Sequence, residues 1–205
     1  MNVDAAQIIQ LVILAGPPVL LAITLHEAAH GYIAKLRGDT TAYTLGRVTL
    51  NPMKHIDPLG TIILPLALLV FNTGFIFGWA KPVPVNFNAL KNPRSDGAMV
   101  ALAGPFANLI LLIISFIPMF LVAYLPQFAS EPPIKMAYYS VMINVVLMIF
   151  NLLPILPLDG GRVVASVLPS KYAYEFGKTE RYGMIIILIL AFPGILGTIM
   201  SPLIN

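Results

Sequence analysis

The chain has 205 residues and a mass of 22.2 kDa, which is room for one domain of ordinary size. Hydrophobic residues make up 58% of it and charged residues 10%, against roughly 25% in a typical soluble domain, and the mean hydropathy is +0.86. The absence of cysteine excludes disulfides, thiolate metal sites and a cysteine nucleophile. The net charge of +3 comes from scattered basic residues, so nucleic acid is not an expected partner. The composition predicts an integral membrane protein.

Long stretches without Asp, Glu, Lys, Arg or His divide the chain. Each is longer than the roughly 18 residues at which an apolar segment becomes a candidate for crossing a membrane. They cover residues 5–25, 58–80, 97–130, 136–158 and 182–205. We therefore expect an all-α polytopic membrane protein with about four spanning helices and one re-entrant apolar segment, in which residues 1–205 form a single domain.

The candidate for re-entry is segment 59–77, which is long enough to cross but is interrupted by Pro65 and by Asn72-Thr73-Gly74. If it crosses, giving five spans, lysine and arginine divide five to seven between the two sides of the membrane. If it enters and leaves by the same face, they divide eleven to one, with only Lys135 on the opposite side. Because positive residues gather on the cytoplasmic side of membrane proteins, the re-entrant arrangement is favoured.

Two polar connectors are candidates for extended structure. Residues 41–50 (TAYTLGRVTL) alternate well enough to predict a short hairpin or strand pair. The segment Trp79–Val85 carries Pro82 and Pro84, which suit only an edge strand. We hypothesise that this segment offers an edge to which a substrate backbone can pair, and a surface connector is the alternative. A small β element in the loops is therefore expected.

The most informative motif is His26-Glu27-Ala28-Ala29-His30. On a helix, residues i and i+4 lie on one face, so His26 and His30 can offer two imidazole nitrogens to one zinc ion. Glu27 lies next to the first histidine, where its carboxylate can reach a zinc-bound water and act as a general base. Three ionisable side chains at membrane depth are costly, and metal binding can offset that cost. A polar helix end with hydrogen-bonded histidines is the alternative.

A catalytic zinc site normally has three protein ligands, so a third is needed. Asp159 stands out because it ends the apolar run NLLPILPLDGG, where Pro154 and Pro157 stop a helix from continuing and the glycines allow close backbone approach. An ordinary aspartate at a helix end is the alternative. His55 and Asp57 are competing ligands, although turn residues at the membrane surface are the simpler explanation.

Three motifs in this order resemble the site-2 protease family of intramembrane zinc metalloproteases: HEAAH at 26–30, LAGPFANL at 102–109 and NLLPILPLDGGR at 151–162. The resemblance covers about residues 15–165. The linking segments GRVTLNPMKHIDPLG and GWAKPVPVN look like the compact bacterial and archaeal branch of that family, which has no PDZ or CBS domain.

This resemblance implies one zinc ion per chain, held by His26, His30 and Asp159, with Glu27 as the catalytic base. It also implies hydrolysis of a membrane-embedded, single-pass protein near the cytoplasmic face of a prokaryotic cell membrane. The partners to expect are the transmembrane substrate and the lipid bilayer, with a homo-oligomer or a regulatory membrane protein as further possibilities.

Asn108 and Asn151 are the remaining candidates for the catalytic site. An amide donor can polarise the scissile carbonyl and stabilise the negative charge that develops on it. The alternative is a hydrogen bond between helices, for which asparagine is also suited. The family resemblance favours a place near the site for both residues.

Two other functions compete with a protease. A metal transporter can use intramembrane histidine and aspartate as a transit site, but it needs access from both faces and often shows repeated halves, neither of which is visible. A catalytically idle scaffold can bind substrates without cutting them. An intact Glu27 beside two histidines argues against the scaffold, which has no evident need for that carboxylate.

Overall fold

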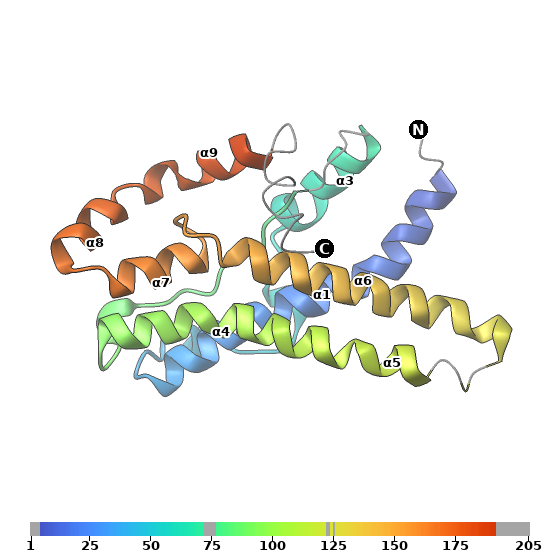
Figure 1. Ribbon diagram of the computed structural model, residues 1–205, viewed down its shortest axis with the longest axis horizontal. Helices are drawn as coiled ribbons and strands as arrows, with labels where there is room; N and C mark the ends of the chain where they lie inside the picture. The colour runs from blue at the N-terminus through green and yellow to red at the C-terminus, as the bar shows by residue number, and fades with distance from the viewer. Residues whose placement is uncertain (1–4, 72–76, 122–123, 125, 192–205) are drawn as a thin grey trace.

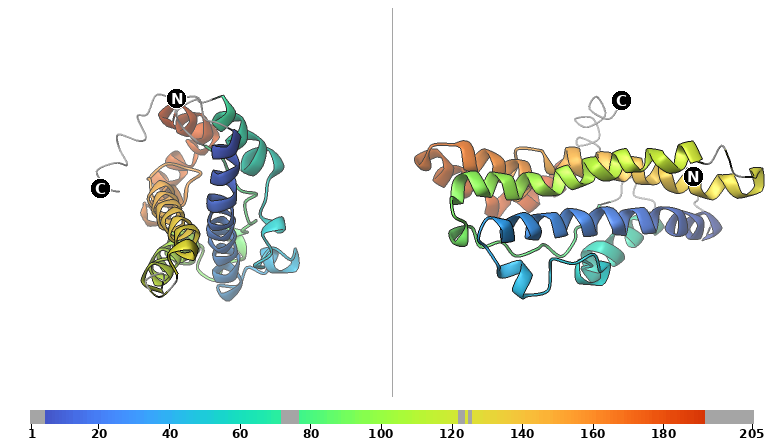
Figure 2. Two further views of the ribbon diagram at one scale, coloured as in Figure 1. Left: turned by 90° about the vertical axis from the view of Figure 1, so that its right-hand side faces the viewer. Right: turned by 90° about the horizontal axis from the view of Figure 1, so that it is seen from below.

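Three long helices form the centre of the molecule. The computed structural model describes residues 5–71, 77–121, 124 and 126–191. The helices α1 (Ala5–Leu36), α4 (Pro93–Ile114) and α6 (Gln127–Asn151) contact one another and lie side by side (Figures 1 and 2). The short helix α5 (Phe116–Leu121) continues the line of α4 (Figure 1).

Shorter helical elements make up most of the remaining described chain. They are α2 (Thr41–Thr44), η1 (Pro52–Lys54), η2 (Pro58–Ile63), α3 (Leu64–Val70), η3 (Phe87–Ala89), α7 (Asp159–Val167), α8 (Ser170–Gly177) and α9 (Glu180–Ala191). The helix α7 packs against α4, which places its first turn next to the three long helices.

The long helices alternate in direction. α1 and α6 run the same way and α4 runs the opposite way (Figure 1). α4 begins beside the end of α1, where the Lys91 N–H donates to the Arg37 carbonyl at 3.0 Å and the Arg37 Nε lies 3.8 Å from the Asp96 carboxylate. The carboxyl ends of α1 and α6 therefore lie at one end of the bundle, which brings the HEAAH motif close to the residues that follow α6.

The prediction of a helical membrane protein is confirmed. Three helical spans, Ala6–Leu36, Pro93–Leu121 and Ala129–Asn151, are long and apolar enough to cross a bilayer, whereas the apolar segment Pro58–Val70 is shorter. Large apolar side chains are exposed along these helices, as contact with hydrocarbon requires. The last uncharged stretch, 182–205, begins within α9 and continues into residues outside the described part of the chain.

The predicted strand pair at 41–50 is wrong, and the described residues contain no strand. Thr41–Thr44 instead form one turn of helix, because the buried Asp39 accepts from the Thr41 N–H at 2.9 Å and the Thr44 hydroxyl donates to the Thr40 carbonyl at 3.1 Å. Gly46 follows with a φ of +64°, a left-handed conformation outside the range of strands. The alternating pattern did not reveal these local side-chain-to-backbone hydrogen bonds.

The helix α6 ends before the uncharged stretch 136–158 does. The helix stops at Asn151, because Pro154 and Pro157 lack the backbone N–H that a helix needs. The chain then turns back so tightly that a Cβ atom on Gly161 would lie 2.5 Å from the Leu156 nitrogen. Glycine at this position therefore allows α7 to begin at Asp159, beside α6.

Candidate metal centre

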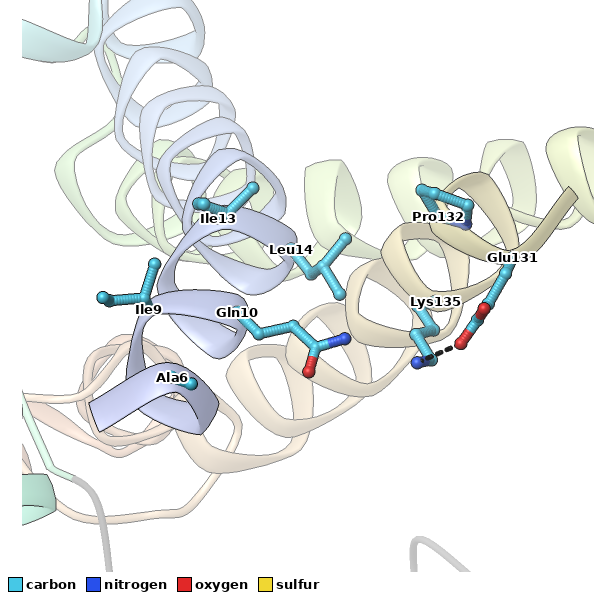
Figure 3. Close-up of a pocket in the computed structure, with 8 residues that line it drawn as sticks. All are labelled: Ala6, Ile9, Gln10, Ile13, Leu14, Glu131, Pro132 and Lys135. Carbon is cyan, nitrogen blue, oxygen red and sulfur yellow. Dashed lines mark ion pairs between the residues drawn. The ribbon is translucent and has the colours of Figure 1, made fainter. Parts of the chain in front are cut away.

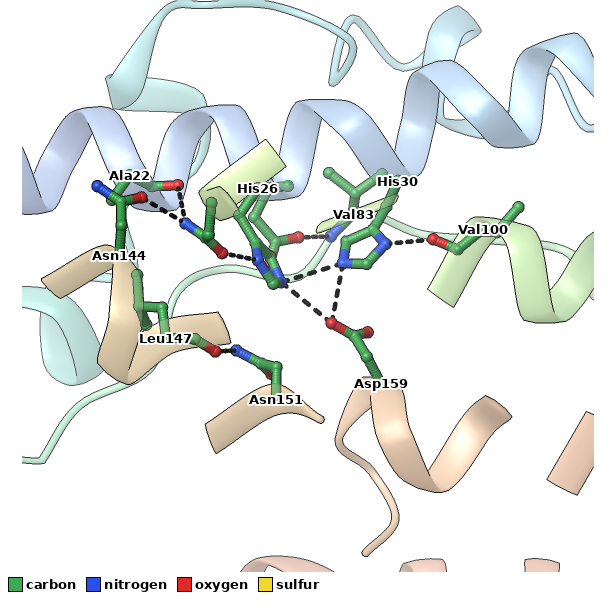
Figure 4. Close-up of polar contacts among 11 residues, drawn as sticks. Ala22, His26, His30, Val83, Val100, Asn144, Leu147, Asn151 and Asp159 are labelled. Carbon is green, nitrogen blue, oxygen red and sulfur yellow. Dashed lines mark hydrogen bonds and ion pairs between the residues drawn. The ribbon is translucent and has the colours of Figure 1, made fainter. Parts of the chain in front are cut away.

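Three side chains from two elements converge at the end of the bundle where α1 and α6 finish. His26 and His30 lie on consecutive turns of α1, and Asp159 is the first residue of α7. The Asp159 Oδ2 lies 3.2 Å from the His26 Nε2 and 3.4 Å from the His30 Nε2, and the two Nε2 atoms are 3.1 Å apart (Figure 4). All three residues are buried. Among the described residues they are the one group of three His, Asp or Glu side chains spaced to hold a metal ion.

The outer nitrogen of the His30 ring is fixed by a backbone group. The His30 Nδ1 lies 2.7 Å from the Val100 carbonyl oxygen (Figure 4). Because a carbonyl oxygen can only accept a hydrogen bond, we assign the ring proton to Nδ1. The His30 Nε2 then carries a lone pair on the side of Asp159.

The outer nitrogen of the His26 ring is fixed by an amide. The His26 Nδ1 lies 2.6 Å from the Asn108 Oδ1. The Asn108 Nδ2 has two acceptors of its own, the Ala22 carbonyl at 3.4 Å and the Asn144 Oδ1 at 2.9 Å. These contacts set the amide orientation, so the Asn108 oxygen accepts from His26 and the His26 proton is also on Nδ1.

Asn108 belongs to a chain of polar side chains between α4 and α6. The Asn144 Nδ2 donates to the Ser140 carbonyl at 2.8 Å, and the hydroxyl oxygens of Ser140 and Ser115 are 2.6 Å apart. Asn108 and Asn144 are 0% and 1% exposed. Polar groups at membrane depth need partners within the protein. The chain of contacts therefore holds Asn108, and through it His26, in one orientation.

The inner atoms of the cluster suit a bound cation. With both rings neutral, two imidazole lone pairs and a carboxylate oxygen face one another, and the Asp159 Oδ2 is buried without a hydrogen bond. Zinc takes this donor set of two imidazoles and one carboxylate and keeps a fourth position for water or substrate. Ligating histidines also commonly donate their other N–H to a carbonyl, as both rings do. The residues present therefore fit zinc.

Glu27 lies outside the cluster of ligands. Its Oε2 accepts from the Val83 N–H at 2.7 Å. Val83 belongs to the segment Trp79–Val85, which therefore packs against the helix that carries the motif. A hydrogen bond from a neutral N–H holds the carboxylate in place and leaves its charge intact.

The other sequence candidates make contacts elsewhere. The Asn151 Nδ2 donates to the Leu147 carbonyl at 3.0 Å, one turn back in α6 (Figure 4). The His55 Nε2 lies 3.0 Å from the Thr49 carbonyl oxygen, and Asp57 accepts from the Gly60 N–H at 2.8 Å as the N-cap of η2. His55 and Asp57 therefore stabilise their loop, in agreement with the simpler explanation of these two residues.

Sequence reasoning missed three contributors to the cluster. Asn144 had a detectable signal, because an amide within an apolar stretch usually has a polar partner. Gly104 lies against both histidines, and a small residue in a membrane helix is the usual sign of such close packing. Val100 acts through its backbone carbonyl and leaves no trace in the sequence.

Two apolar hollows lie away from the cluster. One, of about 530 Å³, lies between the amino-terminal halves of α1 and α6 and is lined by Ile9, Ile13 and Leu14 among others (Figure 3). The Glu131–Lys135 ion pair lies at this hollow (Figure 3). The other, of about 380 Å³, lies between α1 and α4. Neither is lined by a residue of the cluster.

Comparison with known proteins agrees with this geometry. The model of "Peptidase family M50" matches residues 119–192, which include Asp159. The chain is 39% identical over 194 residues to "Putative zinc metalloprotease YwhC" of Bacillus subtilis, a match that covers 91% of this chain and 84% of that protein. It is 26% identical over 175 residues to "Putative zinc metalloprotease Rip2" of Mycolicibacterium smegmatis, covering 83% of this chain and 63% of the relative.

A more distant relative is archaeal. "Zinc metalloprotease MJ0392" of Methanocaldococcus jannaschii is 23% identical over 158 residues, which are 76% of this chain and 34% of that protein. No solved structure matches.

The fold and the site define a helical membrane protein with a buried His-His-Asp cluster suited to zinc. The chain belongs to Peptidase family M50, the site-2 protease family. It is a zinc metalloprotease, and its cofactor is zinc. The membership expected from the three sequence motifs is confirmed.

Proposed function

We propose that this metalloprotease hydrolyses peptide bonds of membrane-embedded proteins and that His26, His30 and Asp159 hold one zinc ion per chain. The observation that carries the proposal is the convergence of two imidazole nitrogens and a carboxylate oxygen within 3.4 Å of one another. Zinc bound there supplies Lewis-acid chemistry, because it polarises the scissile carbonyl and lowers the pKa of a water molecule.

Glu27 is the proposed general base and acid. It neighbours His26 on α1, and the Val83 N–H fixes its Oε2 at 2.7 Å. A carboxylate held there takes a proton from the attacking water and passes it to the leaving amine. The Val83 bond occupies Oε2, so Oε1 is the proposed carrier of that proton.

The two asparagines have different parts in this proposal. The Asn108 oxygen accepts from His26, and its amide N–H groups donate to Ala22 and Asn144. These contacts support a role in orienting a zinc ligand. Asn151 is the remaining candidate for a donor to the scissile carbonyl as negative charge develops on its oxygen.

The proposed substrates are single-pass proteins cut near the cytoplasmic face of a prokaryotic cell membrane, by a single domain that covers residues 1–205. The chain leaves α1 and starts α4 at the same end of the bundle, which supports re-entry of segment 59–77. Re-entry in turn supports this orientation of the active site. With that topology, eleven of the twelve lysines and arginines lie on the side of the metal centre.

The test combines metal analysis with a cleavage assay on a panel of single-pass peptides in proteoliposomes. We expect Glu27→Gln to keep the zinc and to lower the cleavage rate by about 10² to 10⁴-fold. We expect Asp159→Asn to lower the zinc content itself. Glu175→Gln, at an exposed residue of α8, is the matched control. Retained cleavage in Glu27→Gln, or one zinc per chain in Asp159→Asn, would contradict the proposal.

A further inference from the structure

We propose that Arg47 is a positioning residue for Glu27 and acts through the peptide unit between Pro82 and Val83. The inference rests on the proposed role of Glu27 as general base. It assigns a function to a buried arginine that takes no part in the metal cluster.

The contacts form an unbroken line from Arg47 to Glu27. The Arg47 Nη2 donates to the Lys81 carbonyl at 2.8 Å and to the Pro82 carbonyl at 3.2 Å. The Pro82 carbonyl and the Val83 N–H belong to one peptide unit. That N–H donates to the Glu27 Oε2 at 2.7 Å. A guanidinium group and a carboxylate therefore bind the two ends of the same peptide dipole.

This arrangement strengthens the bond to Glu27 for an electrostatic reason. The cation lies at the negative, carbonyl end of the dipole and the anion lies at its positive, N–H end. Hydrogen bonds in such a chain polarise one another, and the effect is larger where the surroundings exclude water. Arg47 is 9% exposed. The Val83 N–H is therefore a stronger donor to Glu27 than an isolated peptide would be.

Local structure directs Arg47 to this peptide. The turn that follows α2 places Gly46 at a φ of +64°, and the Arg47 N–H then donates to the Ala42 carbonyl at 2.9 Å. The Arg47 Nε is buried without a hydrogen-bond partner. Burying a charged group with an unpaired donor costs free energy of folding. A purely structural link between two loops does not account for that cost at Arg47.

Independent contacts set which amide reaches Glu27. The Lys81 N–H donates to the His55 carbonyl at 2.9 Å, and the Thr61 hydroxyl donates to the Trp79 carbonyl at 2.8 Å. Gly31, one helical turn beyond Glu27, leaves room for the Val83 side chain, because a Cβ on Gly31 would lie 3.2 Å from the Val83 Cγ1. The first two contacts hold the segment on the loop of residues 55–61, and the third packs Val83 on α1. None of them involves Arg47, so Arg47 has a separable effect.

The experiment measures amide hydrogen exchange with residue-level fragmentation on the full-length, zinc-loaded protein in detergent micelles. We expect Arg47→Ala to speed exchange of the Val83 amide by about two- to threefold, because the bond to Glu27 is weakened and not removed. The Lys81 amide, which is bonded to His55, should stay protected. Arg47→Lys keeps the charge and should restore part of the protection.

The matched control is Arg94→Ala. Arg94 also binds two backbone carbonyls through its guanidinium, those of Ser166 and Leu168, and its loss should leave the Val83 amide unchanged. A double-mutant cycle with Glu27→Gln adds a second criterion. Because Arg47 and Glu27 act through one peptide, the double variant should exchange no faster at Val83 than the faster single variant.

The cleavage assay completes the test. We expect Arg47→Ala to lower kcat with zinc content unchanged, because the base is displaced and the metal ligands are not. Equally faster exchange of the Lys81 and Val83 amides in Arg47→Ala would show that the whole segment has detached. Additive effects in the double-mutant cycle would show that Arg47 and Glu27 act independently. Either result overturns the inference. If the unmodified protein cleaves no peptide, the proposed function fails, and the exchange data still decide whether Arg47 positions Glu27.

Discussion

Gly104 of α4 lies so close to His26 that a Cβ atom at position 104 would fall 2.6 Å from the His26 Nε2. The same Cβ would approach the His30 Nε2 even more closely. The contact involves the two nitrogens that are proposed to bind zinc, and both rings are held from behind by Asn108 and Val100. The rings therefore have little freedom to move away.

The first prediction follows from this contact. Gly104→Ala should lower the zinc content to well below one ion per chain, because the added methyl group occupies space at the ligand atoms. Metal analysis of the purified protein checks this. The matched control is Gly16→Ala in α1, where a Cβ meets nothing within 4 Å. The control should keep its zinc, because Gly16 lies more than two helical turns from His26. Full zinc occupancy in Gly104→Ala would contradict the geometry.

Asn108 allows a second test, of the hydrogen bond that orients His26. Asn108→Leu has a similar shape and lacks the acceptor for the His26 Nδ1 proton. Zinc affinity should fall by about 10 to 100-fold, the usual cost of losing a partner behind a metal ligand. Competition with a chelator measures this value. Asn151→Leu should leave zinc affinity unchanged, because Asn151 bonds to Leu147 within its own helix. Equal losses in the two variants would show that Asn108 has no special relation to His26.

Asp39 should make stability depend on pH. Burial raises the pKa of its carboxyl group, but hydrogen bonds from Thr41 and Asn86 outweigh this and lower the pKa below the ordinary value. A group with a lowered pKa in the folded state contributes its full stability above the unfolded value of about 3.9, and loses it as the pH falls through the folded value. The contribution is therefore present at neutral pH.

Asp39→Asn tests this directly. The variant should be less stable than the unmodified protein by about 1–2 kcal/mol at pH 7, and the difference should shrink as the pH falls below about 4. Thermal unfolding in detergent at several pH values measures the difference. Glu175→Gln on the exposed face of α8 serves as the control. A difference of constant size from pH 7 to pH 3 would show that the Asp39 charge is not responsible.

The absence of cysteine makes the proposed topology directly measurable. Single replacements Lys135→Cys and Lys171→Cys can be labelled with a membrane-impermeant maleimide, since no other thiol competes. We expect Lys135→Cys to react in intact cells and Lys171→Cys to react only after the membrane is opened. Arg94→Cys should behave like Lys171→Cys if segment 59–77 re-enters. Reaction of Arg94→Cys in intact cells would mean that this segment crosses the membrane.

The parts of the site that were predictable from sequence are those with a local signal. The spacing of His26 and His30 needs only one helical turn, and Asp159 was recognisable because prolines and glycines surround it. The contact between Glu27 and Val83 joins residues far apart in the chain and depends on how the connector folds over α1. The orientation of the Asn108 amide depends on Asn144, so it follows from the packing of α4 against α6.

The error at residues 41–50 has a similar cause. Alternation of apolar and polar residues describes which side chains face inward, and it says nothing about hydrogen bonds between side chains and nearby backbone. Asp39 and Thr44 make such bonds and turn the segment into a short helix.

The polar contacts between α4 and α6 restrict how the molecule can open. Separating these helices would break the Asn108–Asn144 and Ser115–Ser140 hydrogen bonds in a medium that offers no replacements. We therefore expect α4 and α6 to move as one rigid body during turnover. An incoming polypeptide must then reach the zinc by a route that leaves this pair of helices together.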